Sequence, residues 1–184
     1  MATDYIDYMI TDKAAVKNEY RKYYTEKIAY LPGSYQVNDA KRVISDRVFT
    51  RAEVGLPETG FVYCCFNNNY KITPATFDVW MRILKQVEGS VLWLLADSPA
   101  VIANLSKEAE LRGVSANRLV FAPRIAPDEH LARHRLADLF LDTLPYNAHT
   151  TASDALWMGL PLITTPGKSF PARVAASILK AANV

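Results

Sequence analysis

Short apolar runs and amphipathic segments alternate along the chain from about residue 58 to its end. Short apolar runs are typical of strands buried on both faces, and apolar positions recurring every three or four residues are typical of helices. Strands that alternate with helices favour a parallel sheet with helices on both sides. The predicted strands are 60–66, 90–97, 118–123, 138–143 and 161–167. The predicted helices are 74–87, 98–112, 126–136, 151–159 and 172–182.

The first 57 residues do not follow this alternation. Residues 14–31 have a helical pattern, and residues 32–40 are a loop rich in Pro, Gly, Asn and Asp. We therefore expect residues 1–57 to form an irregular, helix-bearing arm. Residues 58–184 should form one α/β domain with a doubly wound, mostly parallel, Rossmann-like sheet. The last predicted helix runs to Val184 without a cap, so we expect the sequence to be part of a longer domain.

Composition narrows the class of protein. Half of the 184 residues are hydrophobic, which suffices for one domain with a core, and the formal net charge is only +2. The densest basic stretch, 17–27, is interrupted by Glu19 and Glu26, as on a solvated helix face, so we expect no nucleic-acid partner. No segment reaches the roughly 20 apolar residues of a membrane span, and the N-terminus lacks a signal-peptide pattern. We expect no membrane partner.

The two cysteines, Cys64 and Cys65, are adjacent in a predicted strand, so their side chains point to opposite faces and cannot form a disulfide together. Reduced thiols are typical of the cytoplasm, where we expect the protein to be located. The three histidines do not have zinc-motif spacing with these cysteines, so no metal site is predicted.

Polar residues gather in the loops that follow the predicted strands. These loops are 67–74, 98–100, 122–130 and 144–154, and three of the four are rich in polar side chains. In open α/β sheets, ligands bind outside the carboxyl ends of the strands. The sequence therefore predicts a binding site at this edge of the sheet.

The chain contains neither G-x-G nor G-x-x-x-x-G-K-[ST], so dinucleotide and P-loop sites are unlikely candidates for this edge. A helix N-terminus can still bind phosphate through its free N–H groups and its dipole. His149, Thr150 and Thr151 open such a helix, and Asp154 lies one turn further, where a carboxylate could accept sugar or ribose hydroxyls. The alternative is that Thr150 or Thr151 only caps the helix and Asp154 complements its dipole.

Two further loops add candidate binding residues. Lys71 follows a strand end, where a cation could neutralise a diphosphate; the alternative is a solvated surface charge. His130 and Arg133 are three residues apart and share one helix face, where they could stack on a base and hydrogen-bond it. The alternative for this pair is an exposed polar face.

Three stretches of the chain resemble the catalytic region of the O-linked N-acetylglucosamine (O-GlcNAc) transferases. They are "FVYCCFNNNYKITPATFDVWMRILKQVEGSVLWLL", "NRLVFAPRIAPDEHLARHRLADLFLDTLPYNAHTTASDALWMGLPLIT" and "PARVAAS". The family also includes plant SPINDLY-type members and bacterial members linked to tetratricopeptide repeats, and the chain resembles the bacterial ones. The resemblance implies a two-lobed GT-B fold in which residues 58–184 are the C-terminal, donor-binding lobe. Residues 1–57 would then be the end of the N-terminal lobe and the passage between the lobes.

The resemblance also implies a reaction: inverting transfer of GlcNAc from UDP-GlcNAc to Ser or Thr hydroxyls of acceptor proteins, without a metal or other cofactor. Lys71 would hold the diphosphate and stabilise the leaving UDP, with Asn68 close by. The uracil would meet the Ala126 backbone, the His130 ring and Arg133. His149, Thr150 and Thr151 would meet the diphosphate and the GlcNAc, and Asp154 the ribose hydroxyls.

The repeats and most of the N-terminal lobe of that family do not match any part of this chain, so we expect the chain alone to be inactive. Two other functions are open. One is a UDP-sugar enzyme of the same fold with different chemistry, such as an epimerase. The other is a non-catalytic nucleotide-binding or interaction module.

Overall fold

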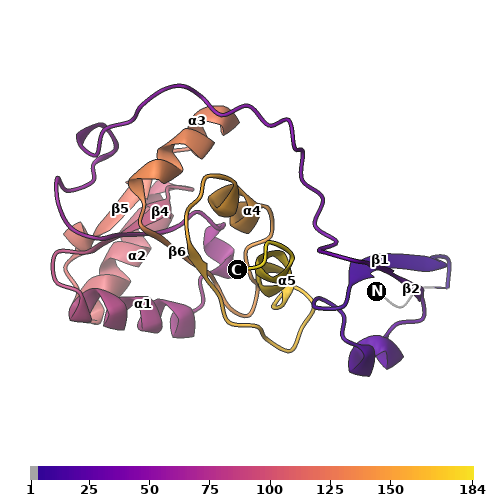
Figure 1. The fold of residues 1–184 in the computed structure, drawn as a ribbon. Coiled ribbons are helices and arrows are strands. Elements are labelled where there is room, and N and C mark those ends of the chain that lie inside the picture. The colour runs from indigo at the N-terminus through magenta and orange to yellow at the C-terminus, as the bar shows by residue number, and fades with distance from the viewer. Residues whose placement is uncertain (1–3) are drawn as a thin grey trace.

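A computed structural model describes residues 4–184 and contains a five-stranded parallel sheet with the strand order β5-β4-β3-β6-β7 (Figure 1). The strands are β3 (Val62–Cys65), β4 (Val91–Leu95), β5 (Leu119–Ala122), β6 (Leu139–Leu141) and β7 (Leu162–Ile163). Each lies within a segment predicted to be a strand, although β7 is much shorter than expected. In the central register, Cys64 of β3 pairs with Trp93 of β4 and Phe140 of β6.

The first four α-helices connect successive strands, as the alternating pattern predicts, and the fifth follows β7. They are α1 (Pro74–Gln86), α2 (Pro99–Leu111), α3 (Pro127–Arg133), α4 (Thr150–Trp157) and α5 (Val174–Ala181). Short 3₁₀ helices are η3 (Asn69–Lys71), η4 (Ala116–Arg118) and η5 (His134–Leu136). Figure 1 shows α1 on one side of the sheet and α3 and α4 on the other. The predicted doubly wound α/β fold is confirmed.

Local sequence signals explain where two of these helices begin. The Thr73 side chain accepts a hydrogen bond from the Thr76 amide at the start of α1, and Ser98 does the same for Val101 at the start of α2. Each cap is followed by a proline in the first turn, where the missing N–H has no helical partner to lose.

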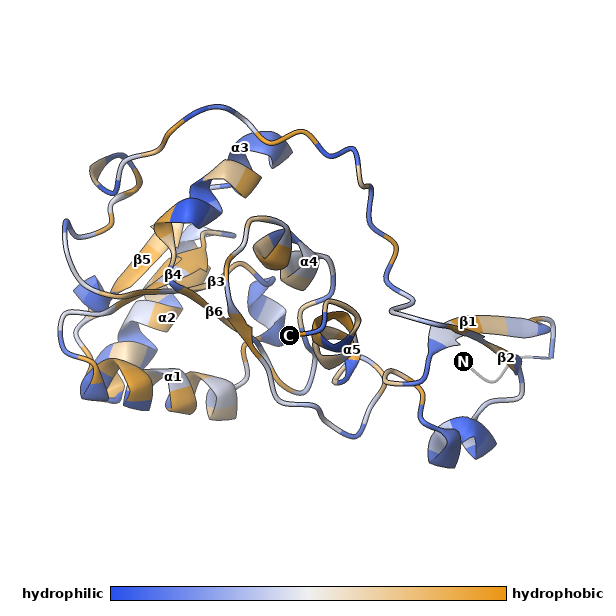
Figure 2. Ribbon diagram, viewed as in Figure 1, coloured by the Kyte–Doolittle hydropathy of each residue, from blue (hydrophilic) through white to orange (hydrophobic). Residues whose placement is uncertain are grey.

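The core is formed where the sheet is covered on both faces. All five residues of β4 and all four of β3 are buried, and Trp93 and Phe140 are fully inaccessible. Figure 2 shows the hydrophobic colour concentrated on the strands, whereas α1 and α3 show hydrophilic colour as well. None of the helices within residues 4–184 combines the length and the apolar character needed to cross a membrane.

The predicted helix over 14–31 is wrong. Instead, β1 (Tyr8–Asp12) and β2 (Lys27–Leu31) form a separate two-stranded parallel sheet, joined by the 3₁₀ helix η1 (Asn18–Tyr23). The exposure of β2 alternates along its length, with Ile28 and Tyr30 half-buried between exposed neighbours, as in a strand. The pairing of β2 with β1 is a tertiary contact, which overrides the local helical pattern.

The small sheet is attached to α5 through buried polar contacts. The Asp12 carboxylate, 1% exposed, accepts hydrogen bonds from the Ala14 and Ala15 amides and from the Ser177 hydroxyl of α5. Arg173, just before α5, donates from Nε to the Ala15 carbonyl at 2.7 Å. Arg173 and Ser177 therefore hold the small sheet against α5.

Between β2 and the 3₁₀ helix η2 (Ala52–Val54), residues 32–51 contain no helix or strand, and we call this segment the strap. Figure 1 shows it running from the small sheet past α4 and α3 before the chain enters β3. Arg42 of the strap contacts α4, and the Ser45 amide donates to the Asp128 carbonyl of α3 at 3.3 Å. The strap therefore lies along the edge of the sheet where the predicted binding loops emerge.

Candidate functional site

A cavity of about 520 Å³ lies where the strand order changes direction, between the loops after β3 and β6. At this point one connection leads to each side of the sheet, which opens a crevice at the carboxyl ends of the strands. Eight of the nine predicted site residues line this cavity. They are Asn68, Lys71, His130, Arg133, His149, Thr150, Thr151 and Asp154.

The ninth predicted residue, Ala126, is the N-cap of α3 and does not line the cavity itself. Its neighbours Ile125 and Pro127 do. Loops that are far apart in the sequence are thus brought together as predicted.

Lys71 lines the cavity and is only 9% exposed. Its Nζ donates to the Asn147 carbonyl at 2.9 Å and lies 4.1 Å from the centre of the Tyr146 ring. Burial lowers the pKa of Lys71, and the charge of nearby Asp142 opposes that shift. Lys71 is therefore not a solvated surface charge, because it is held between the loops after β3 and β6.

Helix α4 begins at the cavity with His149 as its N-cap. Neither Thr150 nor Thr151 caps the helix, so the capping alternative is wrong. Within residues 4–184, the amide N–H groups of these two threonines have no acceptor, and they mark the positive end of the helix dipole. Anions are stabilised at such a position.

The His149 ring stacks on Tyr146, with ring centres 5.1 Å apart and planes 23° apart. Burial, and then the Lys71 charge, lower the pKa of His149 below its ordinary value of 6.5. His149 is consequently neutral at pH 7 and can offer a ring nitrogen to a ligand without adding charge. Tyr146 thus contacts both a cation and an imidazole, a role that the sequence did not reveal.

Two polar residues, Asn67, which is buried, and Asp142, which is half-buried, organise this region and were missed by the sequence analysis. Asn67 donates to the Thr143 hydroxyl at 2.8 Å, and its carbonyl oxygen accepts from the Thr151 hydroxyl. The Asp142 carboxylate accepts from the amides of Thr143 and Ala148, at 2.7 and 2.6 Å. These bonds fold the loop that carries Tyr146 and His149. Their positions directly after β3 and β6 were the only signal in the sequence.

Arg133 also lines the cavity, is 2% exposed and contacts His130. Its guanidinium donates to the Pro123 carbonyl at 2.7 Å and to His130 Nδ1 at 2.6 Å, and it packs over the Phe66 ring. Because a guanidinium has no acceptor, Nδ1 must accept, and the proton of the neutral His130 ring is on Nε2.

Burial, followed by the charges of His134 and Arg133, lowers the pKa of His130 to about 3. Burial also lowers the pKa of Arg133 to about 10, so this residue remains charged at pH 7. The pair does share one helix face, but that face is largely buried, so the alternative of an exposed polar face is wrong.

Asp154 is 6% exposed and forms an ion pair with Arg42 of the strap. Arg42, which also lines the cavity, was not singled out from the sequence because it lies 112 residues away. Arg124 lies at the rim and donates to Asp97 at 2.6 Å and to Asn68 at 3.1 Å. Residues 4–184 contain no group of His, Cys, Asp and Glu side chains that could hold a metal ion.

Comparison with protein families identifies the family of this chain. The model of glycosyl transferase family 41 matches residues 42–184, which include every residue lining the cavity. The chain belongs to this family. The strap residue Arg42 lies at the first matched position.

The chain is 38% identical over 98% of its length to a probable UDP-N-acetylglucosamine–peptide N-acetylglucosaminyltransferase, SEC, of Arabidopsis thaliana, of which it covers 19%. It is 43% identical over 73% of its length to such an enzyme of Caenorhabditis elegans, covering 12% of that protein. Among solved structures, a variant of the O-GlcNAc transferase of Thermobaculum terrenum superposes with a TM-score of 0.83 at 29% identity. That match covers 96% of this chain and 33% of the other. The chain thus spans about a fifth or less of these curated relatives.

Proposed function

We propose that this chain is the donor-binding part of an inverting glycosyltransferase that transfers GlcNAc from UDP-GlcNAc to Ser and Thr hydroxyls of proteins. The observation that carries the proposal is the meeting of the Lys71 ammonium and the free N–H groups of α4 in one cavity. A cation and a helix N-terminus aimed at one space are suited to a diphosphate. The names of the relatives, which specify UDP-N-acetylglucosamine and peptide, support the same donor and acceptor class.

In this assignment, the nucleotide extends across the cavity. The uracil packs on His130 and meets the backbone near Ala126, and the ribose hydroxyls donate to Asp154. The diphosphate lies between Lys71 and the N-terminus of α4, with Asn68, His149, Thr150 and Thr151 around the phosphate and the sugar. Arg133 acts through His130, which it holds as the Nε2–H tautomer.

The barrier to transfer is the departure of a UDP anion from a carbon with oxocarbenium character. A buried cation and preorganised N–H donors stabilise the charge that develops on the leaving phosphate. Lys71 and α4 supply both, so we propose that the reaction needs neither a metal nor another cofactor. Because Lys71 already contacts a carbonyl and an aromatic ring, its position requires little rearrangement when the donor binds.

We further propose that the acceptor protein is positioned by an N-terminal lobe and tetratricopeptide repeats elsewhere in a longer polypeptide. The chain on its own would bind UDP but transfer no sugar, since positioning of the acceptor supplies a large share of the rate. A cytoplasmic location agrees with Cys64 and Cys65, which are both free thiols and both buried.

The proposal is tested by calorimetry with UDP on this chain and by labelled-sugar transfer with the full-length protein. Lys71→Ala should lower kcat by about a hundredfold or more while weakening donor binding less, because the cation matters most where charge develops. Lys85→Ala, which removes an exposed lysine of α1, is the matched control and should leave kcat unchanged. Near-normal kcat in the Lys71 variant would refute the assignment, and epimerisation of UDP-GlcNAc without transfer would favour the epimerase.

A further inference from the structure

Asp154 is a carboxylate with almost no access to water, and its counter-ion comes from outside the sheet domain. Among residues 4–184, Arg42 of the strap provides the only hydrogen bond to this carboxylate. A buried charge without a partner is strongly destabilising, so the ion pair compensates the cost of placing an aspartate inside helix α4. The Arg42 guanidinium itself is also largely covered, with a side-chain exposure of 23%.

The pair uses only part of the carboxylate. Arg42 donates from Nη1 to Oδ1, and no residue of the described chain donates to Oδ2. A carboxylate can accept several hydrogen bonds, so Oδ2 remains available to a ligand while Oδ1 is held. Both partners line the cavity, and an oxygen fixed by a charged hydrogen bond has less rotational freedom to lose when a hydroxyl binds.

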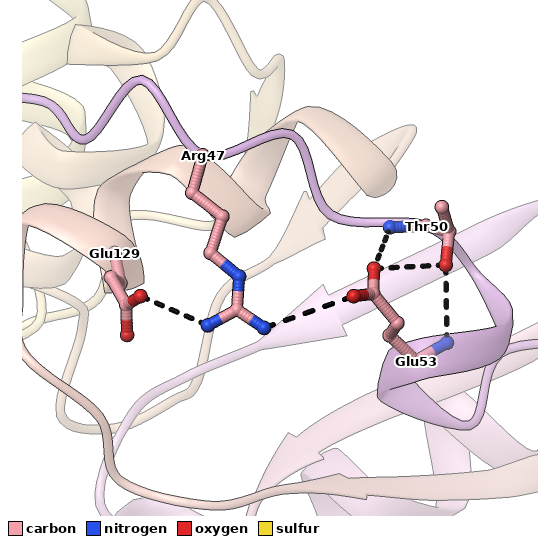
Figure 3. Close-up of polar contacts among 4 residues, drawn as sticks. All are labelled: Arg47, Thr50, Glu53 and Glu129. Carbon is pink, nitrogen blue, oxygen red and sulfur yellow. Dashed lines mark hydrogen bonds and ion pairs between the residues drawn. The ribbon is translucent and has the colours of Figure 1, made fainter.

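The position of Arg42 is supported by contacts outside the cavity. Figure 3 shows Arg47, five positions further along the strap, between Glu129 of α3 and Glu53, at 3.0 and 3.8 Å. Glu53 in turn accepts from the Thr50 amide at 2.7 Å, which closes the turn into η2 (Figure 3). The Ser45 backbone is bonded to α3 as well. The strap is thus fastened beyond Arg42, so its side chain approaches Asp154 from a defined direction.

We propose that Arg42 is a positioning residue for the donor: it holds the Asp154 carboxylate in a fixed orientation so that the free oxygen accepts a ribose hydroxyl. This inference rests on the proposed function, which assigns the ribose to Asp154. It gives the strap a part in donor selectivity, in favour of nucleotides that carry ribose hydroxyls. The ion pair persists in the bound state and is not a barrier that the nucleotide must break.

The test compares the binding of UDP and 2′,3′-dideoxy-UDP to this chain by calorimetry. Arg42→Ala should weaken UDP binding by about tenfold, the usual scale for one hydrogen bond to a charged group, and weaken dideoxy-UDP binding by less than about twofold. Arg42→Lys, which keeps the charge, should restore part of the preference for UDP. In an Asp154→Asn background, Arg42→Ala should have little further effect, because its partner is already lost.

Lys41→Ala is the matched control, since it removes the neighbouring exposed cation of the strap, and it should change neither affinity. Circular dichroism and thermal unfolding establish that the Arg42 variants are folded. Unchanged or tighter UDP binding by Arg42→Ala would overturn the inference, and so would an equal loss for both nucleotides. If the unaltered chain fails to bind UDP, or does not prefer it to the dideoxy analogue, the assignment of the ribose to Asp154 fails and the role of Arg42 fails with it.

Discussion

At the scale of single residues, the cavity is lined by imidazoles that are kept neutral and by cations that are kept in place. Arg133 donates to His130 Nδ1, so the neutral ring keeps its proton on Nε2. His149 is neutral for a related reason, since burial and Lys71 both disfavour its protonated form. Among these groups, the positive charge is therefore carried by Lys71, Arg133 and the N-terminus of α4, and not by the imidazoles.

A pH dependence of stability follows from His130. Its pKa is about 3 in the folded chain and near 6.5 when unfolded, so below pH 6.5 the unfolded chain takes up a proton that the folded chain does not. The free energy of unfolding should therefore fall as the pH is lowered from 6.5 toward 3, by up to about 1.4 kcal/mol per pH unit from this residue. Urea unfolding between pH 7 and pH 5 measures the slope. His130→Gln should flatten it in part, and identical slopes for both proteins would contradict the prediction.

At the scale of elements, the start of β3 is packed against the turn between α1 and β4. Gly60 has φ +103°, and a Cβ there would lie 2.3 Å from the Gly89 carbonyl oxygen. Gly89 also has a positive φ, +69°, but a Cβ there would meet nothing within 4 Å. A side chain at either glycine would strain the backbone, but only a side chain at Gly60 would also clash with a neighbouring atom. Substitutions at the two positions therefore separate the cost of backbone strain from the cost of the steric clash.

Gly89→Ala should cost about 1–2 kcal/mol of unfolding free energy, the usual penalty for a left-handed residue with a side chain. Gly60→Ala should cost about 2 kcal/mol or more beyond that, because backbone atoms must move to relieve the contact. Denaturant unfolding of both variants, with the unaltered chain as reference, measures the two losses of unfolding free energy. Equal losses would show that the strands can separate slightly at this edge without cost.

At the scale of the whole molecule, a nearly neutral chain concentrates positive charge in one place. The formal net charge is +2, yet Arg42, Lys71, Arg124 and Arg133 all line the cavity and Asp154 is the only acidic residue among the lining side chains. Such a field attracts anionic ligands and is screened by salt.

We therefore expect the affinity of the chain for UDP to fall severalfold as the ionic strength rises from low to physiological values. Uridine, which has the same base and ribose without phosphate, should bind more weakly, with an affinity that hardly changes. Parallel calorimetric titrations of the two ligands measure the difference. A salt effect of equal size on both would show that the cavity does not bind UDP through its phosphates.

The sequence by itself determined the five strands and the helices between them, because burial on both faces and helical periodicity are local patterns. The starts of α1 and α2 are local as well, because the capping side chain, the proline and the following turn are neighbours in the chain. The sequence also indicated that the loops carrying Lys71, His130 and Thr150 meet, since the carboxyl ends of parallel strands share one edge of a sheet.

Only the tertiary structure decided what depends on contacts between distant residues. The segment 27–31 is a strand because Lys27 pairs with Tyr8, and no local pattern contains the energy of that pairing. Arg42 belongs to the cavity because the strap brings it to Asp154, 112 residues away. Asn67 joins two loops because it donates to Asp142 and to Thr143, whereas in the sequence these are ordinary polar residues after strands. Local sequence encodes propensity and burial, but the partner of a polar side chain is fixed only when the folded chain brings the two together.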